Sequence, residues 1–200
     1  MTGTTKPMLA LGVLAALACA PSAKEPPPVP PLASDSAAVG RAREAANALG
    51  KDLQGLLFSQ LERGGPASAI AFCADSAQVR TVRHAGEGVY VRRVSLKVRN
   101  PANTPDAFER AALETLASRY ASGQLPAELV EVRGRGSNRQ LQYLRPILVQ
   151  EKCLSCHGDP AQIDPAVKQV VSARYPTDAA VGYRAGDLRG AISVRVPAPE

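Results

Sequence analysis

The chain of 200 residues contains no tryptophan, only two methionines and only two histidines. Both methionines, Met1 and Met8, lie in a leader segment that we expect to be removed. The mature chain therefore has no methionine thioether as a metal ligand, and its only imidazoles are those of His84 and His157. Aromatic residues make up 4% of the sequence, so they fill little of any core.

The chain also lacks a strong charge bias and a long hydrophobic run. Its formal net charge is +6, and no dense Lys/Arg run with interleaved aromatics is present, so a nucleic-acid partner is not expected. The apolar stretch over residues 8–17 is too short to span a bilayer as a helix. What remains after the leader is enough for one globular domain, which we place at residues 36–198.

Residues 1–19 have the features of an export signal, with Lys6 before the apolar stretch. The sequence Ala16-Leu17-Ala18 fits two processing routes: cleavage that discards Cys19, or a lipoprotein route that leaves Cys19 as a lipidated first residue. A lipobox prefers leucine where Ala16 stands. The proline-rich linker at residues 20–35 resembles a lipoprotein tether and favours lipidation. We expect a periplasmic protein, anchored to the membrane through lipid on Cys19 or otherwise soluble.

The central motif is Cys153-Leu154-Ser155-Cys156-His157. Two cysteines separated by two residues and followed directly by histidine form the attachment signature of c-type haem. The spacing lets each thiol form a thioether with one haem vinyl group, and the histidine then offers its imidazole to the iron. Export supports this interpretation, because bacterial c-type maturation attaches haem outside the cytoplasm. We predict one covalent haem c bound by Cys153, Cys156 and His157.

Two other chemistries fit the pair of cysteines. A redox dithiol is expected at the start of a long helix, whereas Gly158-Asp159-Pro160 ends regular structure here. A zinc site needs two further ligands, which Cys73 and one histidine would supply.

The pattern of apolar residues predicts an α+β domain with a helical pair at its N-terminus and an antiparallel sheet flanked by helices. Gly64-Gly65 and Pro66 separate the two helices of the pair. Two phases of alternation around Arg92-Arg93 predict a β-bulge there, and Thr104 is the expected cap of the helix that follows. The predicted helices cover residues 36–63, 66–83, 105–122 and 165–175, and the predicted strands cover 88–99, 129–133, 139–149 and 188–196.

The second axial position of the iron has several candidates. Cys73 lies in an apolar helical stretch, where a free cysteine is commonly a small buried hydrophobe. An unpaired thiol in an exported protein is a liability, however, and the other cysteines are already used. Iron is therefore its natural partner. His84, at a helix end, is the second choice, and a lysine, a tyrosine or an open site stay possible.

Several segments together resemble one family, the single-haem c-type cytochromes with a PAS-like domain, long catalogued as a domain of unknown function. The resemblance covers residues 37–196. It is carried by residues 69–73, 94–103, 105–106, 153–160, 175–178, 182–183 and 186–191. It implies a PAS-like antiparallel sheet and axial ligation of the haem by His157 and Cys73. It also implies electron transfer or redox and gas sensing as the function, with an unidentified redox or signalling partner.

We therefore expect a haem protein that carries or senses electrons and is not an enzyme. The alternatives are a peroxidase-like haem enzyme with an open distal site and a zinc-stabilised binding module. Several arginines are open to two interpretations, a solvated surface or contact with the haem propionates or an acidic redox partner. They are Arg92, Arg93, Arg99, Arg133, Arg135, Arg139 and Arg189.

Overall fold

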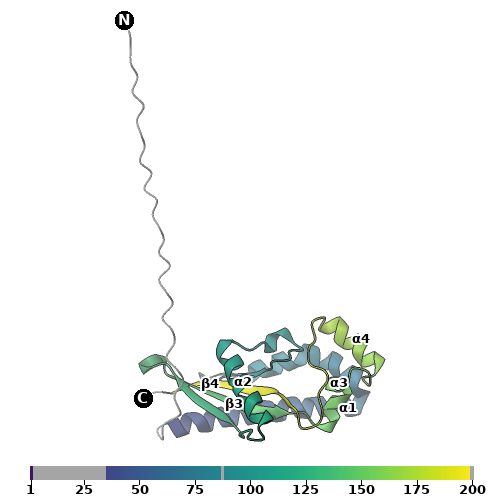
Figure 1. Cartoon of the computed structure of the whole chain (residues 1–200), viewed down its shortest axis with the longest axis horizontal. Helices are drawn as coiled ribbons and strands as arrows, with labels where there is room; N and C mark the ends of the chain where they lie inside the picture. The colour runs from purple at the N-terminus through teal and green to yellow at the C-terminus, as the bar shows by residue number, and fades with distance from the viewer. Residues whose placement is uncertain (2–34, 87, 199–200) are drawn as a thin grey trace.

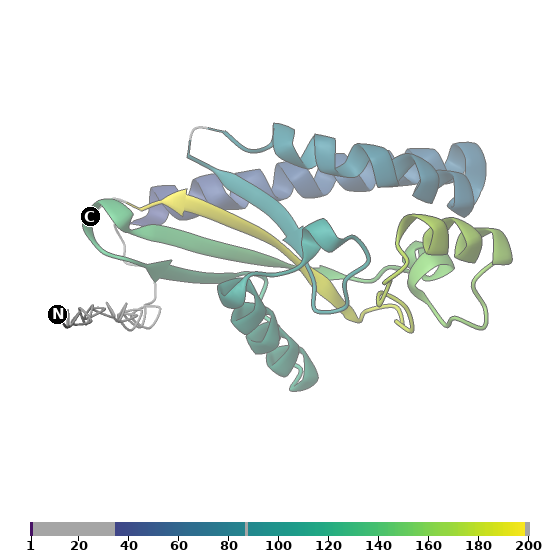
Figure 2. The ribbon, with the colours of Figure 1, turned by 90° about the horizontal axis from the view of Figure 1, so that it is seen from above.

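The computed structural model describes residue 1, residues 35–86 and residues 88–198. It contains a four-stranded antiparallel sheet in the order β1-β4-β3-β2, with helices on both of its faces (Figure 1, Figure 2). The expected α+β fold is confirmed, and it is consistent with a PAS-like sheet. Its principal elements are α1 (Ser36–Arg83), β1 (Tyr90–Val94), α2 (Ala107–Ala121), β2 (Leu129–Arg133), β3 (Gln140–Leu148), α3 (Leu154–His157), α4 (Pro165–Arg174) and β4 (Leu188–Pro197).

The long helix α1 is a hairpin of two arms. Gly65 has φ 71° and ψ −176°, a conformation that side chains with a Cβ rarely adopt, and Pro66 then begins the second arm. Asp52 on the first arm is bonded to Arg80 on the second and lies 3.0 Å from Nε2 of His84, so the arms run antiparallel (Figure 2). The predicted helical pair, broken at these residues, is confirmed.

The two faces of the sheet carry separate cores. Val91 packs into the core between the sheet and the first arm of α1, whereas Val94 packs into the core between the sheet and α2. β1 pairs with β4 in regular register over Tyr90–Val94. The predicted β-bulge at Arg92-Arg93 is therefore wrong. The change of phase arises because both faces of the strand are buried, and the register shift in this sheet lies between Ile147 and Leu148 of β3.

Helix α2 begins later than predicted. Asp106, and not Thr104, caps it: the Asp106 carboxylate accepts from the Glu109 backbone N–H at 2.8 Å, and Glu109 accepts from the Asp106 N–H at 3.0 Å. This reciprocal pair satisfies two N–H groups at the start of the helix. Strands β2, β3 and β4 match the predicted ranges to within one residue at each end.

The basic hairpin between β2 and β3 is not a fully solvated surface. Arg139 is buried and binds both carboxylate oxygens of Asp35, at 2.6 and 2.9 Å, while the Arg133 guanidinium lies 4.1 Å from the centre of the Phe108 ring. These contacts join the hairpin to the start of α1 and to α2.

The predicted export signal, the residue Cys19 and most of the proline-rich linker lie outside the described residues. Within the part of the chain that is described, no helix is long and apolar enough to cross a membrane.

Candidate cofactor site

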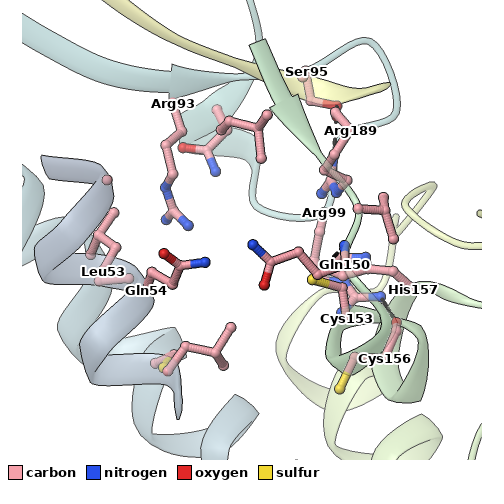
Figure 3. A pocket seen from close by; sticks show the side chains of 18 of the residues that line it. Leu53, Gln54, Arg93, Ser95, Arg99, Gln150, Cys153, Cys156, His157 and Arg189 are labelled. Carbon is pink, nitrogen blue, oxygen red and sulfur yellow. Dashed lines mark hydrogen bonds between the residues drawn. The ribbon is translucent and has the colours of Figure 1, made fainter. Parts of the chain in front are cut away.

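The cysteine motif forms a short helical segment at one end of the sheet. A 3-10 turn, Glu151–Cys153, leads into α3, and Gly158 follows His157 as the C-cap. Cys153 and Cys156 are half-buried free thiols. Together with His157 they line a cavity of about 710 Å³, shown in Figure 3. This volume is within the range of small-molecule and cofactor sites, roughly 300–1,000 Å³.

His157 is held in one tautomer by a backbone contact. Its Nδ1 donates to the carbonyl oxygen of Ala180 at 2.6 Å, and because a carbonyl only accepts, Nδ1 carries the proton. The lone pair of Nε2 is therefore free for a metal. Burial, with the nearby charges of Arg99 and Arg189, lowers the pKa of His157 to about 3, so the imidazole is neutral at physiological pH.

Arg99 joins the motif to the loop that orients the histidine. Its Nη2 donates to the carbonyl oxygens of Cys156 at 2.6 Å and Ala180 at 3.3 Å, and to Asp178 Oδ2 at 2.9 Å. The other Asp178 oxygen accepts from the Ala180 N–H at 2.8 Å. Sequence reasoning left Arg99 undecided between surface and site, and its place in the resembling segment 94–103 was the signal that it belongs to the site.

Cys73 lies on the second arm of α1 and lines the same cavity as His157. It is a half-buried free thiol. Burial raises the pKa of the Cys73 thiol, and the Arg93 charge opposes that increase. The cavity thus contains a sulfur donor from α1 and a nitrogen donor from α3, far apart in the sequence.

His84 is not among the residues that line the cavity. It caps the C-terminal end of α1, and its Nε2 lies 3.0 Å from Asp52 Oδ2. Of Cys73 and His84, the structure brings only Cys73 to the cavity wall, which also includes Lys51, Lys152 and Tyr175.

The cysteines and histidines do not assemble as a zinc site. Among residue 1, residues 35–86 and residues 88–198, no three His, Cys, Asp or Glu side chains are grouped closely enough to hold a metal ion. A Cys73, Cys153, Cys156 and histidine centre therefore has no support from the geometry.

Known proteins resemble the chain in sequence and in fold. The family model described as Tll0287-like matches residues 30–197. The crystal structure of the cyanobacterial heme-protein Tll0287 is similar to the chain, with a TM-score of 0.61 and 28% identity, over 81% of this chain and 96% of that one. No curated protein sequence matches the chain. Because the family model spans most of the sequence, the chain belongs to the Tll0287-like family.

Proposed function

We propose that this protein is a haem protein, and more specifically a monohaem c-type cytochrome that transfers or senses electrons. The single observation that carries the proposal is that the Cys153, Cys156 and His157 triplet and Cys73 face one cavity. Family membership and similarity to a structurally characterised heme-protein support haem binding. Covalent attachment and the choice of axial ligands rest on the motif and on the geometry of this chain.

The residues of the cavity fit a haem in three respects. The free thiols of Cys153 and Cys156, separated by two residues, lie beside the neutral imidazole of His157, whose Nε2 is unprotonated. The walls are largely apolar, with Leu57, Ile70 and Ile147 among them. A second soft donor, the thiol of Cys73, comes from a different element. We infer that Cys153 and Cys156 form the thioethers and that His157 and Cys73 are the axial ligands.

A haem held there would supply one-electron redox chemistry. The protein would offer Nε2 of His157 to the iron. The Ala180 carbonyl fixes the orientation of the imidazole, and the apolar wall excludes water. Cys73 as a thiolate would favour ferric over ferrous iron and lower the reduction potential relative to methionine. Cys73 would hold the iron in both oxidation states if the protein is a carrier. It would hold only the ferric form if the protein is a sensor that binds a gas when reduced.

We further propose that the protein is exported and tethered on the periplasmic side through lipid on Cys19. The export pattern of residues 1–19 and the proline-rich linker support this location. A separate redox or signalling protein is the expected partner.

Absorption spectra of the full chain, produced with c-type maturation machinery, test this function. We expect a low-spin ferric spectrum and c-type α and β bands after reduction. Carbon monoxide then separates the two roles, because a carrier that stays six-coordinate ignores it and a sensor binds it when reduced. A colourless protein would contradict the proposal, and peroxide turnover by a five-coordinate ferric form would favour an enzyme.

A further inference from the structure

The charged groups around the cavity all have the same sign. Six cationic side chains line it, and none of the described residues in its lining is an aspartate or glutamate. The cations are Lys51, Arg93, Arg99, Arg145, Lys152 and Arg189. A cavity with this lining is suited to an occupant that carries negative charge.

Among these six cations, Arg99, Arg145 and Lys152 have partners on other elements. Arg99 is paired with Asp178 at 2.9 Å, and Arg145 donates to the Asn47 side-chain oxygen. The Lys152 ammonium lies 4.9 Å from the centre of the Phe58 ring, near the cavity. Of the six, only Arg99 therefore has a carboxylate partner among the described residues. Arg93 and Arg189, unlike Arg145, also have no side-chain amide as partner there.

Arg189 is bound only to neutral groups. Its Nη1 donates to Ser95 Oγ at 2.6 Å and to the Lys97 carbonyl at 3.0 Å, and its guanidinium lies 5.5 Å from the centre of the Tyr183 ring. These contacts fix the side chain but do not neutralise its charge. Arg189 is thus oriented for a charged partner that the rest of the described chain does not provide.

Arg93 is the more unusual of the two. Its Nε is buried without a hydrogen-bond partner, and its guanidinium makes no ion pair among the described residues. The side chain reaches from β1 into the cavity, as Figure 3 shows. Burial and the charge of Arg189 both lower the pKa of Arg93. A partly buried guanidinium with a buried, unsatisfied Nε and no paired charge is unfavourable, so this position favours an anion beside it.

The two arginines line the cavity from neighbouring strands. Arg93 pairs across the sheet with Ile192 of β4, and Arg189 stands at the beginning of that strand. Guanidinium groups bind carboxylates through two parallel N–H···O bonds. Two such forks in one cavity therefore suit a ligand with two carboxylates.

We propose that Arg93 and Arg189 bind the two propionates of the haem, so that the acidic edge of the haem lies against β1 and β4. This inference rests on the proposed function, because it assigns the orientation of the same prosthetic group. Propionate binding would neutralise the charges of Arg93 and Arg189. Arg93 is then a positioning residue whose charge changes how readily the iron is reduced.

The test compares Arg93→Gln, Arg93→Lys and Arg195→Gln in the haem-loaded full chain. Arg195→Gln is the matched control, because it removes a charge from β4 outside the cavity lining. There Arg195 lies 3.9 Å from Asp106 and 4.4 Å from the centre of the Tyr90 ring. Resonance Raman spectroscopy follows the propionate bending band, and a redox titration gives the ferric-to-ferrous ratio at a fixed potential.

In Arg93→Gln we expect the propionate band to shift and the ferric-to-ferrous ratio to rise on the order of tenfold, because a charge near a buried site acts through an effective dielectric constant of about 20. Arg93→Lys should shift the band and leave the ratio close to that of the wild type. Arg195→Gln should change neither. If Arg93→Gln does not accumulate, the band shift in Arg93→Lys decides the question.

An unchanged band and ratio in a haem-loaded Arg93 variant would overturn the assignment. So would a wild-type ratio that responds to added phosphate, since the arginines would then bind a free anion. Failure of the proposed function has a different signature, because the wild type itself would then carry no haem.

Discussion

The Nδ1 atom of His157 lies 2.6 Å from the carbonyl oxygen of Ala180, and this contact determines which nitrogen of the motif's histidine is free. Ala180 belongs to the loop before β4, which also contacts the motif through the backbone: the Tyr183 N–H donates to the His157 carbonyl at 3.0 Å. The orientation of the proximal imidazole therefore depends on a segment that follows the motif by more than twenty residues.

Arg99 is the residue whose loss should loosen this arrangement. Arg99→Gln leaves Asp178 without its cation and weakens the hold on the Cys156 and Ala180 carbonyls. We expect the free energy of unfolding of the haem-loaded protein to fall by about 3 kcal/mol, since both partners of the pair are largely buried. Denaturant unfolding measures it. Arg110→Gln, on the exposed face of α2, serves as the control and should change stability by less than about 0.5 kcal/mol.

Cys73→Ser tests the second axial ligand. The hydroxyl is a poor replacement for a thiolate, so the ferric spectrum should change from low spin to high spin or to a different low-spin form, and the reduction potential should rise. His84→Ala is the matched comparison, because His84 does not line the cavity, and its spectrum should equal that of the wild type. The opposite pattern, with Cys73→Ser unchanged and His84→Ala altered, would assign the ligand to His84.

Gly65→Ala tests the reversal of α1. At φ 71° and ψ −176°, a region essentially restricted to glycine, a Cβ costs about 1–3 kcal/mol, so the melting temperature should fall. Gly55→Ala is the control, because Gly55 lies inside the first arm and a Cβ added there would meet no other atom within 4 Å. There alanine should stabilise the helix by about 0.5–1 kcal/mol. Equal effects of the two substitutions would mean that residue 65 does not need its left-handed conformation.

The acid dependence of stability should include a contribution from Glu128. Its carboxylate accepts from Arg43 Nε at 2.9 Å and Nη2 at 2.6 Å, and from the Tyr143 hydroxyl at 2.9 Å. The Arg43 hydrogen bond holds the pKa of Glu128 below its ordinary value of 4.5. Since the folded pKa is depressed, this stabilisation is present above pH 4.5 and is lost as the pH falls through the folded value.

Glu128→Gln should therefore lower stability by about 1 kcal/mol at neutral pH and by progressively less in acid. Unfolding curves from pH 3 to pH 7 for the wild type and the variant would show this convergence. A difference that stays constant across the range would mean that the charge of Glu128 contributes nothing to stability.

Local patterns predicted the elements well, because alternation and helix-stop signals are local properties. Gly65 and Pro66 marked the hairpin of α1, and the strands were found to within a residue for β2, β3 and β4. It was harder to predict against which face of the sheet each residue packs. Val91 and Val94 pack on opposite sides of β1. The change of phase predicts a bulge only for a sheet that is buried on one face, and this strand is buried on both.

In the site, too, local features were easier to predict than contacts between distant segments. The sequence reveals the motif residues Cys153, Cys156 and His157 because haem attachment requires a fixed spacing. It indicates Cys73 because this is the one thiol for which no other role was predicted. For Arg93, Arg99 and Arg189 the sequence left two interpretations open, a solvated surface and the haem site, and only for Arg99 and Arg189 did the resembling segments 94–103 and 186–191 point to the site. The three arginines come from β1, the following loop and β4, and only the pairing of β1 with β4 brings them to one cavity.

The most direct test of the central claim is the intact mass of the denatured mature protein, measured beside the Cys153→Ala, Cys156→Ala double variant. We predict that the wild type retains the mass of one haem after denaturation and acid–acetone extraction, and that the double variant does not. A wild-type chain that releases its haem, or that never carries one, would contradict the account.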